Sequence, residues 1–115
     1  MIKLLSITAV FALAAVASVP AHAGGLTGAQ KINQLKLVDA GHVLIKGADS
    51  ADWNNPDGCG NATWAVVPVA NPSYREKLAM LLAAKNANRS INMKVVGCHS
   101  VGSTSYPSVK DIILN

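Results

Sequence analysis

The chain has 115 residues, of which 50% are hydrophobic, and it carries a formal net charge of +4. That length accommodates one domain, which excludes a multidomain enzyme and a polytopic membrane protein. Much of the hydrophobicity lies in the first two dozen residues, and the chain without residues 1–23 has 92 residues. A domain of that size buries only about 60–65% of its unfolded surface, so a covalent link would add stability that a small core lacks.

Residues 1–23 predict a secretory signal peptide. Lys3 supplies the positive charge, an apolar stretch follows, and Ala21-His22-Ala23 is a small-x-small cleavage site. The alternative is a retained anchor helix, but the apolar stretch is short of the roughly 20 residues that span a bilayer. We therefore expect a periplasmic or secreted protein with no stable membrane span after cleavage.

The two cysteines of the chain, Cys59 and Cys98, both follow the predicted cleavage site. An exported chain meets an oxidising compartment, so an even number of cysteines favours a disulfide. A metal site is the alternative, but there is no C-x-x-C, and His99 beside Cys98 does not complete a zinc-ligand spacing. The sequence predicts a structural disulfide and no metal.

The predicted elements begin after a flexible N-terminal lead, residues 24–30, and lie in a single domain, residues 31–115. Alternating or β-branched patterns predict strands at residues 31–38, 42–46, 62–69, 90–96 and 109–114. Runs of turn-forming residues predict loops at 47–61 and 99–105. In the fourth strand, Ile91, Met93 and Val95 are expected to point inward.

One helix is predicted between the third and fourth strands. Asn71 is the expected cap and Pro72 the first helical residue, and the helix is expected to end at residues 86–88. Its apolar stripe comprises Tyr74, Leu78, Leu81 and Leu82.

The order β-β-β-α-β-β predicts an α+β, mostly β fold: a five-stranded barrel like the oligonucleotide/oligosaccharide-binding (OB) fold. The alternative is an open α+β sheet with the helix on one face.

Several short motifs resemble those of small, largely uncharacterised exported proteins of Gram-negative bacteria. They are Gly58-Cys59, Asn71-Pro72-Ser73-Tyr74, Leu78 to Lys85, Val95-Val96-Gly97-Cys98 and Tyr106-Pro107-Ser108-Val109. The resemblance covers most of residues 31–115 and implies a secreted β-rich domain closed by a single disulfide, with no catalytic residue to transfer. The element order alone is similar to the OB-fold B subunits of AB5 toxins, which bind glycans as pentamers, so a homo-oligomer stays an open alternative.

Neither a nucleic-acid partner nor a cofactor is predicted. After residue 23 the nine lysines and arginines occur singly rather than in blocks, which is typical of a solvated surface. The pair Gly58 and Gly60 lacks the third glycine and the lysine of a phosphate-binding loop.

Catalysis is not predicted either, although two candidate groups exist. His42 and His99 have no partner spacing typical of an activated nucleophile, and His42 is expected on a sheet face. Asp49, Asp52 and Asp57 share one loop, where aspartate is usually a turn residue; as calcium ligands they lack the expected spacing.

Aromatic residues carry the binding prediction. Trp53 lies in a polar loop between Asp52 and Asn54, and a tryptophan with polar neighbours suits stacking on a sugar or docking a protein. The alternative is that Trp53 folds back over the core. His99 and Tyr106 border the second loop, which the disulfide is expected to bring beside the first, whereas Trp64 and Tyr74 are expected in the core.

The sequence therefore predicts a periplasmic or secreted binding module without enzymatic activity, whose ligand is a glycan or another protein. An envelope protein that pairs with a partner through a strand edge is the first alternative. A small hydrolase is the second.

Overall fold

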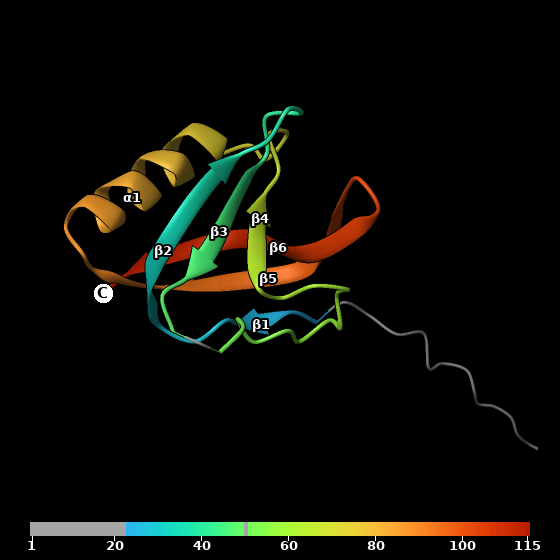
Figure 1. The fold of residues 1–115 in the computed structure, drawn as a ribbon, viewed down its shortest axis with the longest axis horizontal. Coiled ribbons are helices and arrows are strands. Elements are labelled where there is room, and N and C mark those ends of the chain that lie inside the picture. The colour runs from blue at the N-terminus through green and yellow to red at the C-terminus, as the bar shows by residue number, and fades with distance from the viewer. Residues whose placement is uncertain (1–22, 50) are drawn as a thin grey trace, which may run out of the picture.

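The computed structural model describes residues 23–49 and 51–115, so the predicted signal peptide, apart from Ala23, lies outside the described residues. The described part contains six strands and one helix (Figure 1). The strands are β1 (Gly25–Leu26), β2 (Gln30–Leu37), β3 (Val43–Gly47), β4 (Trp64–Val67), β5 (Ser90–Val101) and β6 (Thr104–Leu114), and the helix is α1 (Tyr74–Asn86).

The strands form one sheet in the order β1-β5-β2-β3-β4-β6, and β5 also pairs with β6. Strands β2, β3, β4, β6 and β5 therefore pair in a closed cycle. All pairings are antiparallel except that of β4 with β6, where Val66 lies opposite Ser108. A mostly β fold is confirmed, with one helix that lies between β4 and β5 in the chain, the third and fourth of these five strands in sequence order.

Strand β1 was not predicted, and the element order is β-β-β-β-α-β-β. Gly25 and Leu26 pair with Val95 and Lys94 of β5, where the sequence predicted a flexible lead. A strand of two residues that includes a glycine leaves no periodicity to detect, so only its long-range pairing reveals it.

The prediction of a loop at residues 99–105 is wrong, because β5 and β6 continue into a long hairpin there. His99 pairs with Tyr106, and Ser100 pairs with Ser105. Only Gly102 and Ser103 form the turn, and Gly102 adopts a φ of +64°, which glycine reaches without strain.

The core lies between the sheet and α1. Ile91, Met93 and Val95 are buried within it, as predicted from their alternation. Helix α1 lies beside β2 and near the C-terminal end of β6 (Figure 1), and it buries Leu81 and Ala84. Leu82, predicted on the same apolar stripe, is 48% exposed.

Helix α1 begins at Tyr74, two residues after the predicted start. Ser73 is the N-cap but makes no side-chain capping bond. The Asn71 side chain instead accepts a hydrogen bond from the Ser73 amide at 3.1 Å, and its carbonyl accepts one from the Tyr74 amide at 3.0 Å. Asn71 thus closes a turn ahead of the helix, the other local role that asparagine commonly takes.

No helix in residues 23–49 and 51–115 is long and apolar enough to cross a membrane.

Candidate functional site

Trp53, the main predicted contact residue, lies in the core. Its side chain is 2% exposed and belongs to the main hydrophobic cluster. The indole Nε1 donates a hydrogen bond to the Ile45 carbonyl at 3.0 Å, and the Trp53 amide donates one to the Ala62 carbonyl at 3.0 Å. Of the two alternatives for Trp53, the structure selects burial, and no face of its ring is available to stack on a ligand.

Trp64 is the tryptophan that reaches the surface, so the prediction of a core position for it is wrong. It is half-buried, and the ammonium nitrogens of Lys36 and Lys46 each lie 5.9 Å from its ring centroid. Ala65 and Val67 of the same strand are buried in the core. Because side chains alternate along a strand, Trp64 is turned to the opposite face.

Strand register brings the two lysines to Trp64. Lys46 of β3 lies directly opposite Trp64 of β4, and Lys36 of β2 lies opposite Leu44 of β3. Three neighbouring strands therefore contribute one residue each to a single patch. We call Lys36, Lys46 and Trp64 the Trp64 patch.

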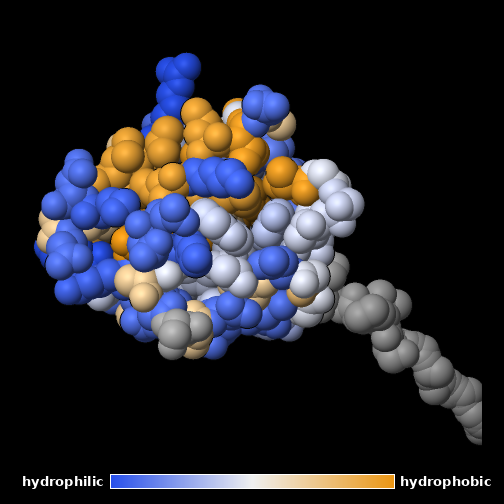
Figure 2. All heavy atoms as spheres, viewed as in Figure 1, coloured by the Kyte–Doolittle hydropathy of each residue, from blue (hydrophilic) through white to orange (hydrophobic). Residues whose placement is uncertain are grey.

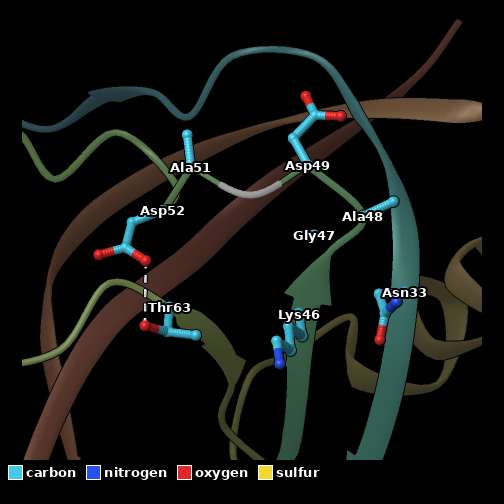
Figure 3. Close-up of a pocket in the computed structure, with 8 residues that line it drawn as sticks. All are labelled: Asn33, Lys46, Gly47, Ala48, Asp49, Ala51, Asp52 and Thr63. Carbon is cyan, nitrogen blue, oxygen red and sulfur yellow. Dashed lines mark hydrogen bonds between the residues drawn. The ribbon is translucent and has the colours of Figure 1, made fainter.

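A polar cavity of about 420 Å³ shares Lys46 with the Trp64 patch, and Figure 3 shows the residues that line this cavity. It is lined by Asn33, Lys46, Gly47, Ala48, Asp49, Ala51, Asp52 and Thr63. Lys46 belongs to both the cavity and the patch, and Thr63 precedes Trp64. Within the cavity, the Thr63 hydroxyl donates a hydrogen bond to the Asp52 carboxylate at 3.0 Å. The cavity and the patch thus share Lys46, and Thr63 and Trp64 are neighbours in the chain.

Asn54, the other predicted neighbour of Trp53, ties its loop to the N-terminal segment. Its backbone amide donates a hydrogen bond to the Thr27 carbonyl at 3.2 Å. Its side-chain amide lies 3.5 Å from the carbonyl oxygen of Leu26 in β1. Asn54 does not line the polar cavity.

His99 and Tyr106 are half-buried cross-strand neighbours on the β5–β6 hairpin. The His99 ring meets the His42 ring edge to face, with centroids 4.7 Å apart. His42 Nδ1 accepts a hydrogen bond from the Val69 amide at 3.0 Å, which leaves Nε2 to carry the proton of the neutral ring. Neither His99 nor Tyr106 lines the cavity that contains Asp52.

The surroundings of His99 disfavour its charged form. Burial lowers the pKa of His99 from its ordinary value, and the neighbouring His42 lowers it further. These surroundings favour the neutral form of His99. No hydrogen bond in the described residues positions either histidine ring against a hydroxyl or thiol nucleophile.

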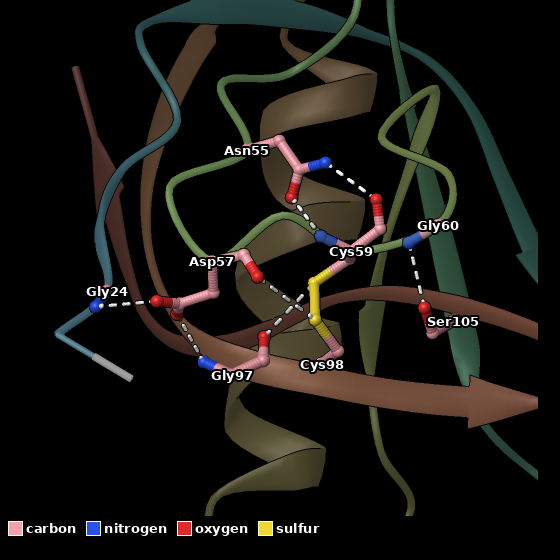
Figure 4. The surroundings of a disulfide bond; sticks show 8 residues. All are labelled: Gly24, Asn55, Asp57, Cys59, Gly60, Gly97, Cys98 and Ser105. Carbon is pink, nitrogen blue, oxygen red and sulfur yellow. Dashed lines mark hydrogen bonds between the residues drawn. A yellow bond between two sulfur atoms is a disulfide. The ribbon is translucent and has the colours of Figure 1, made fainter. Parts of the chain in front are cut away.

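The predicted disulfide is confirmed: Cys59 is bonded to Cys98, and their Cα atoms are 5.6 Å apart. Figure 4 shows that further hydrogen bonds hold the cysteine loop against the β5–β6 hairpin. The Gly60 amide donates to the Ser105 hydroxyl at 2.8 Å, and the Gly97 amide donates to the Asp57 carboxylate at 2.6 Å. The disulfide does bring the two predicted loop segments together, although the second is a hairpin.

The three loop carboxylates do not gather at one place. Asp49 and Asp52 line the cavity, whereas Asp57 accepts hydrogen bonds from the amides of Gly97 and Gly24. Within the part of the chain that the structure describes, no group of three or more histidine, cysteine, aspartate or glutamate residues could hold a metal ion.

A second surface is apolar. Figure 2 shows hydrophobic residues gathered on the upper part of the viewed face. A groove of about 210 Å³ between β2 and α1 is lined by Leu35, Lys36, Leu37, Val43, Leu78 and Leu82. Leu37 is 69% exposed at its rim.

Comparison of the chain with protein-family models, with characterised proteins and with solved structures finds no match.

Proposed function

We propose that this protein is an exported, non-enzymatic binding module with an OB-like barrel, and that its ligand is a glycan. The closed cycle of strands β2, β3, β4, β6 and β5, with α1 between the third and fourth strands in chain order, supports the barrel. The disulfide supports export, since such bonds persist in oxidising compartments.

The observation that carries the glycan proposal is the polar cavity beside an accessible tryptophan. Asp49, Asp52, Asn33 and Thr63 offer carboxylate, amide and hydroxyl groups to the cavity, and sugar hydroxyls both donate to and accept from such groups. The Trp64 ring adds an apolar plane on which the C–H face of a sugar packs. Small-ligand sites in proteins combine these two features.

A glycan array followed by titration calorimetry tests this proposal. We expect the wild-type protein to bind a subset of glycans, and we expect Asp52→Ala and Trp64→Ala each to weaken that binding at least tenfold. Asp39→Ala is the matched control, since Asp39 is exposed in the turn between β2 and β3 and does not line the cavity. An array without bound glycans, or binding that both site variants leave unchanged, contradicts the proposal.

A protein ligand is the second candidate function. The exposed side chains of Leu37 and Leu82 beside the apolar groove favour it, because grouped apolar side chains on a surface often mark interaction sites. Pairing through a strand edge is less well supported, because β2 to β6 pair with one another in a closed cycle.

A further inference from the structure

We propose that the glycan carries a carboxylate, and that Lys36 and Lys46 hold this charge while Trp64 packs against the sugar ring. This inference rests on the proposed glycan-binding function and names the chemical class of its ligand.

Two positive charges lie near one half-buried ring. Lys36 and Lys46 come from neighbouring strands, and both ammonium nitrogens lie 5.9 Å from the Trp64 centroid. A ring face attracts cations, but two ammonium groups at the same ring repel each other. An anion bound near both ammonium groups offsets that repulsion and is attracted by two positive charges.

The ring itself sets the position of the ligand. Trp64 is half-buried, and both ammonium nitrogens lie over its ring at 5.9 Å from the centroid, so a sugar that packs against this ring lies next to two positive charges. A pyranose ring has an apolar face formed by its C–H groups, and a carboxylate at its edge would lie near those charges. The geometry therefore suits an acidic sugar better than a simple inorganic anion.

The polar cavity favours a ligand that also carries hydroxyl groups, away from its carboxylate. Asp49 and Asp52 line it, and ionised carboxylates accept hydrogen bonds but donate none. A DNA strand has no free hydroxyl groups along its backbone, so it would offer these carboxylates no hydroxyl donor. An acidic sugar chain supplies hydroxyl groups for the carboxylates and an anion for the lysines.

Titration calorimetry with oligogalacturonate and with its methyl ester tests the inference, because the two probes differ in charge but share the same sugar ring. We expect the wild-type protein to bind the acid form about tenfold more tightly than the ester, and to lose that preference at high salt. The double variant Lys36→Gln/Lys46→Gln is expected to bind the acid form about tenfold more weakly.

The matched control is Arg75→Gln/Lys85→Gln, which removes the same net charge from exposed positions on α1. It is expected to leave the affinity unchanged. Equal affinity for acid and ester, an unaffected Lys36→Gln/Lys46→Gln variant, or no binding of oligogalacturonate overturns the inference. Binding to anionic lipid vesicles in place of oligogalacturonate overturns it too.

The failure of this inference differs from the failure of the proposed function. If array glycans bind in an Asp52-dependent manner but the ligand's carboxylate does not change the affinity, the proposed glycan-binding function is supported and the inference of an acidic ligand is contradicted. If no glycan binds, both are contradicted.

Discussion

Trp53 and Trp64 differ in what surrounds their rings. Trp53 is 2% exposed and hydrogen-bonded through its indole nitrogen to Ile45. Trp64 is half-buried, and the ammonium nitrogens of Lys36 and Lys46 each lie 5.9 Å from its ring centroid. The first residue stabilises the fold, and the second is the residue that we propose contacts the ligand.

Fluorescence distinguishes the two environments, because the chain has only these two tryptophans. A Trp64→Phe variant retains Trp53, whose emission should be blue-shifted and weakly quenched by acrylamide. A Trp53→Phe variant retains Trp64, whose emission should be red-shifted and strongly quenched. Equal quenching of the two variants, with both shown to be folded by circular dichroism, would contradict the assignment.

His99 makes stability depend on pH. Because burial and His42 lower the pKa of His99 below 6.5 in the folded state, the unfolded chain binds its proton more readily than the folded chain. The free energy of unfolding should therefore be highest above about pH 6.5 and fall as the pH is lowered through the interval between the unfolded and folded pKa values. Urea denaturation at pH 7 and at about pH 5 measures this loss.

His99→Gln serves as the comparison for that measurement. The variant lacks the titrating ring, so its stability should decrease less between the two pH values than that of the wild-type protein. An identical decrease in both proteins would show that His99 does not contribute.

Residue-level prediction from sequence failed at the tryptophans for an identifiable reason. Residues 62–69 are apolar at almost every position, so alternation could not show which face of the strand meets the core. The polar neighbours of Trp53 indicated exposure, but its backbone bonds to Ala62 and its indole bond to Ile45 join parts of the chain that no local pattern connects. By contrast, Ile91, Met93 and Val95 alternate with the polar residues Asn92 and Lys94, which was sufficient to predict their inward orientation.

At the scale of elements, Asp57 joins three segments of the chain. Its carboxylate accepts hydrogen bonds from Gly97 in β5 at 2.6 Å and from Gly24, just before β1, at 3.3 Å. The cysteine loop is thereby held to β5 by a charge-assisted contact as well as by the disulfide (Figure 4).

Replacing Asp57 tests the strength of this junction. Asp57→Ala leaves the Gly97 amide without its partner, and we expect the free energy of unfolding to fall by about 1–3 kcal/mol. Asp39→Ala, which removes an exposed turn carboxylate, should change it by less than about 0.5 kcal/mol. A loss for Asp57→Ala no larger than that of the control would contradict the structural role.

The elements that sequence reasoning missed are those defined by pairing between distant segments. Strands β2, β3 and β4 and the helix were located to within a few residues, whereas β5 ends five residues after its predicted end and β6 begins five residues before its predicted start. Strand β1 is held by its register with β5, and the hairpin at residues 99–106 by cross-strand pairs of serine, histidine and tyrosine. Neither arrangement leaves a hydrophobic pattern along the chain.

At the scale of the whole molecule, the disulfide closes the loop between residues 59 and 98, a separation of 39 positions. That segment contains β4, α1 and most of β5. Closing a loop of this length removes conformational entropy from the unfolded chain, which stabilises the folded state by roughly 4 kcal/mol in the chain-entropy model. The number of cysteines and the predicted export were sufficient to predict this bond.

Removing the disulfide should therefore be costly. The variant Cys59→Ser/Cys98→Ser is expected to lose about 2–5 kcal/mol of the free energy of unfolding, measured by urea denaturation. Dithiothreitol should destabilise the wild-type protein by a similar amount and leave the variant unchanged. A wild-type midpoint that does not respond to full reduction would contradict this account.

The candidate site was predicted only in part, since it depends on the assembled sheet. Asp52 was identified from its loop and does line the cavity. Lys36, Lys46 and Trp64 were not identified, because each is unremarkable in its own strand and only the register of β2, β3 and β4 brings them together. His99 and Tyr106 do come together, but on the hairpin beside His42 rather than at the cavity.

The most direct measurement is a titration of the ¹⁵N-labelled protein with oligogalacturonate, followed through its two indole N–H signals. The account predicts that the Trp64 signal shifts progressively until saturation, together with the backbone amides of Lys36, Lys46 and Asp52. The Trp53 signal, whose proton is held by the Ile45 carbonyl, should stay in place. A Trp64 signal that does not move while other parts of the surface respond, or no response to the ligand at all, would contradict the central claim.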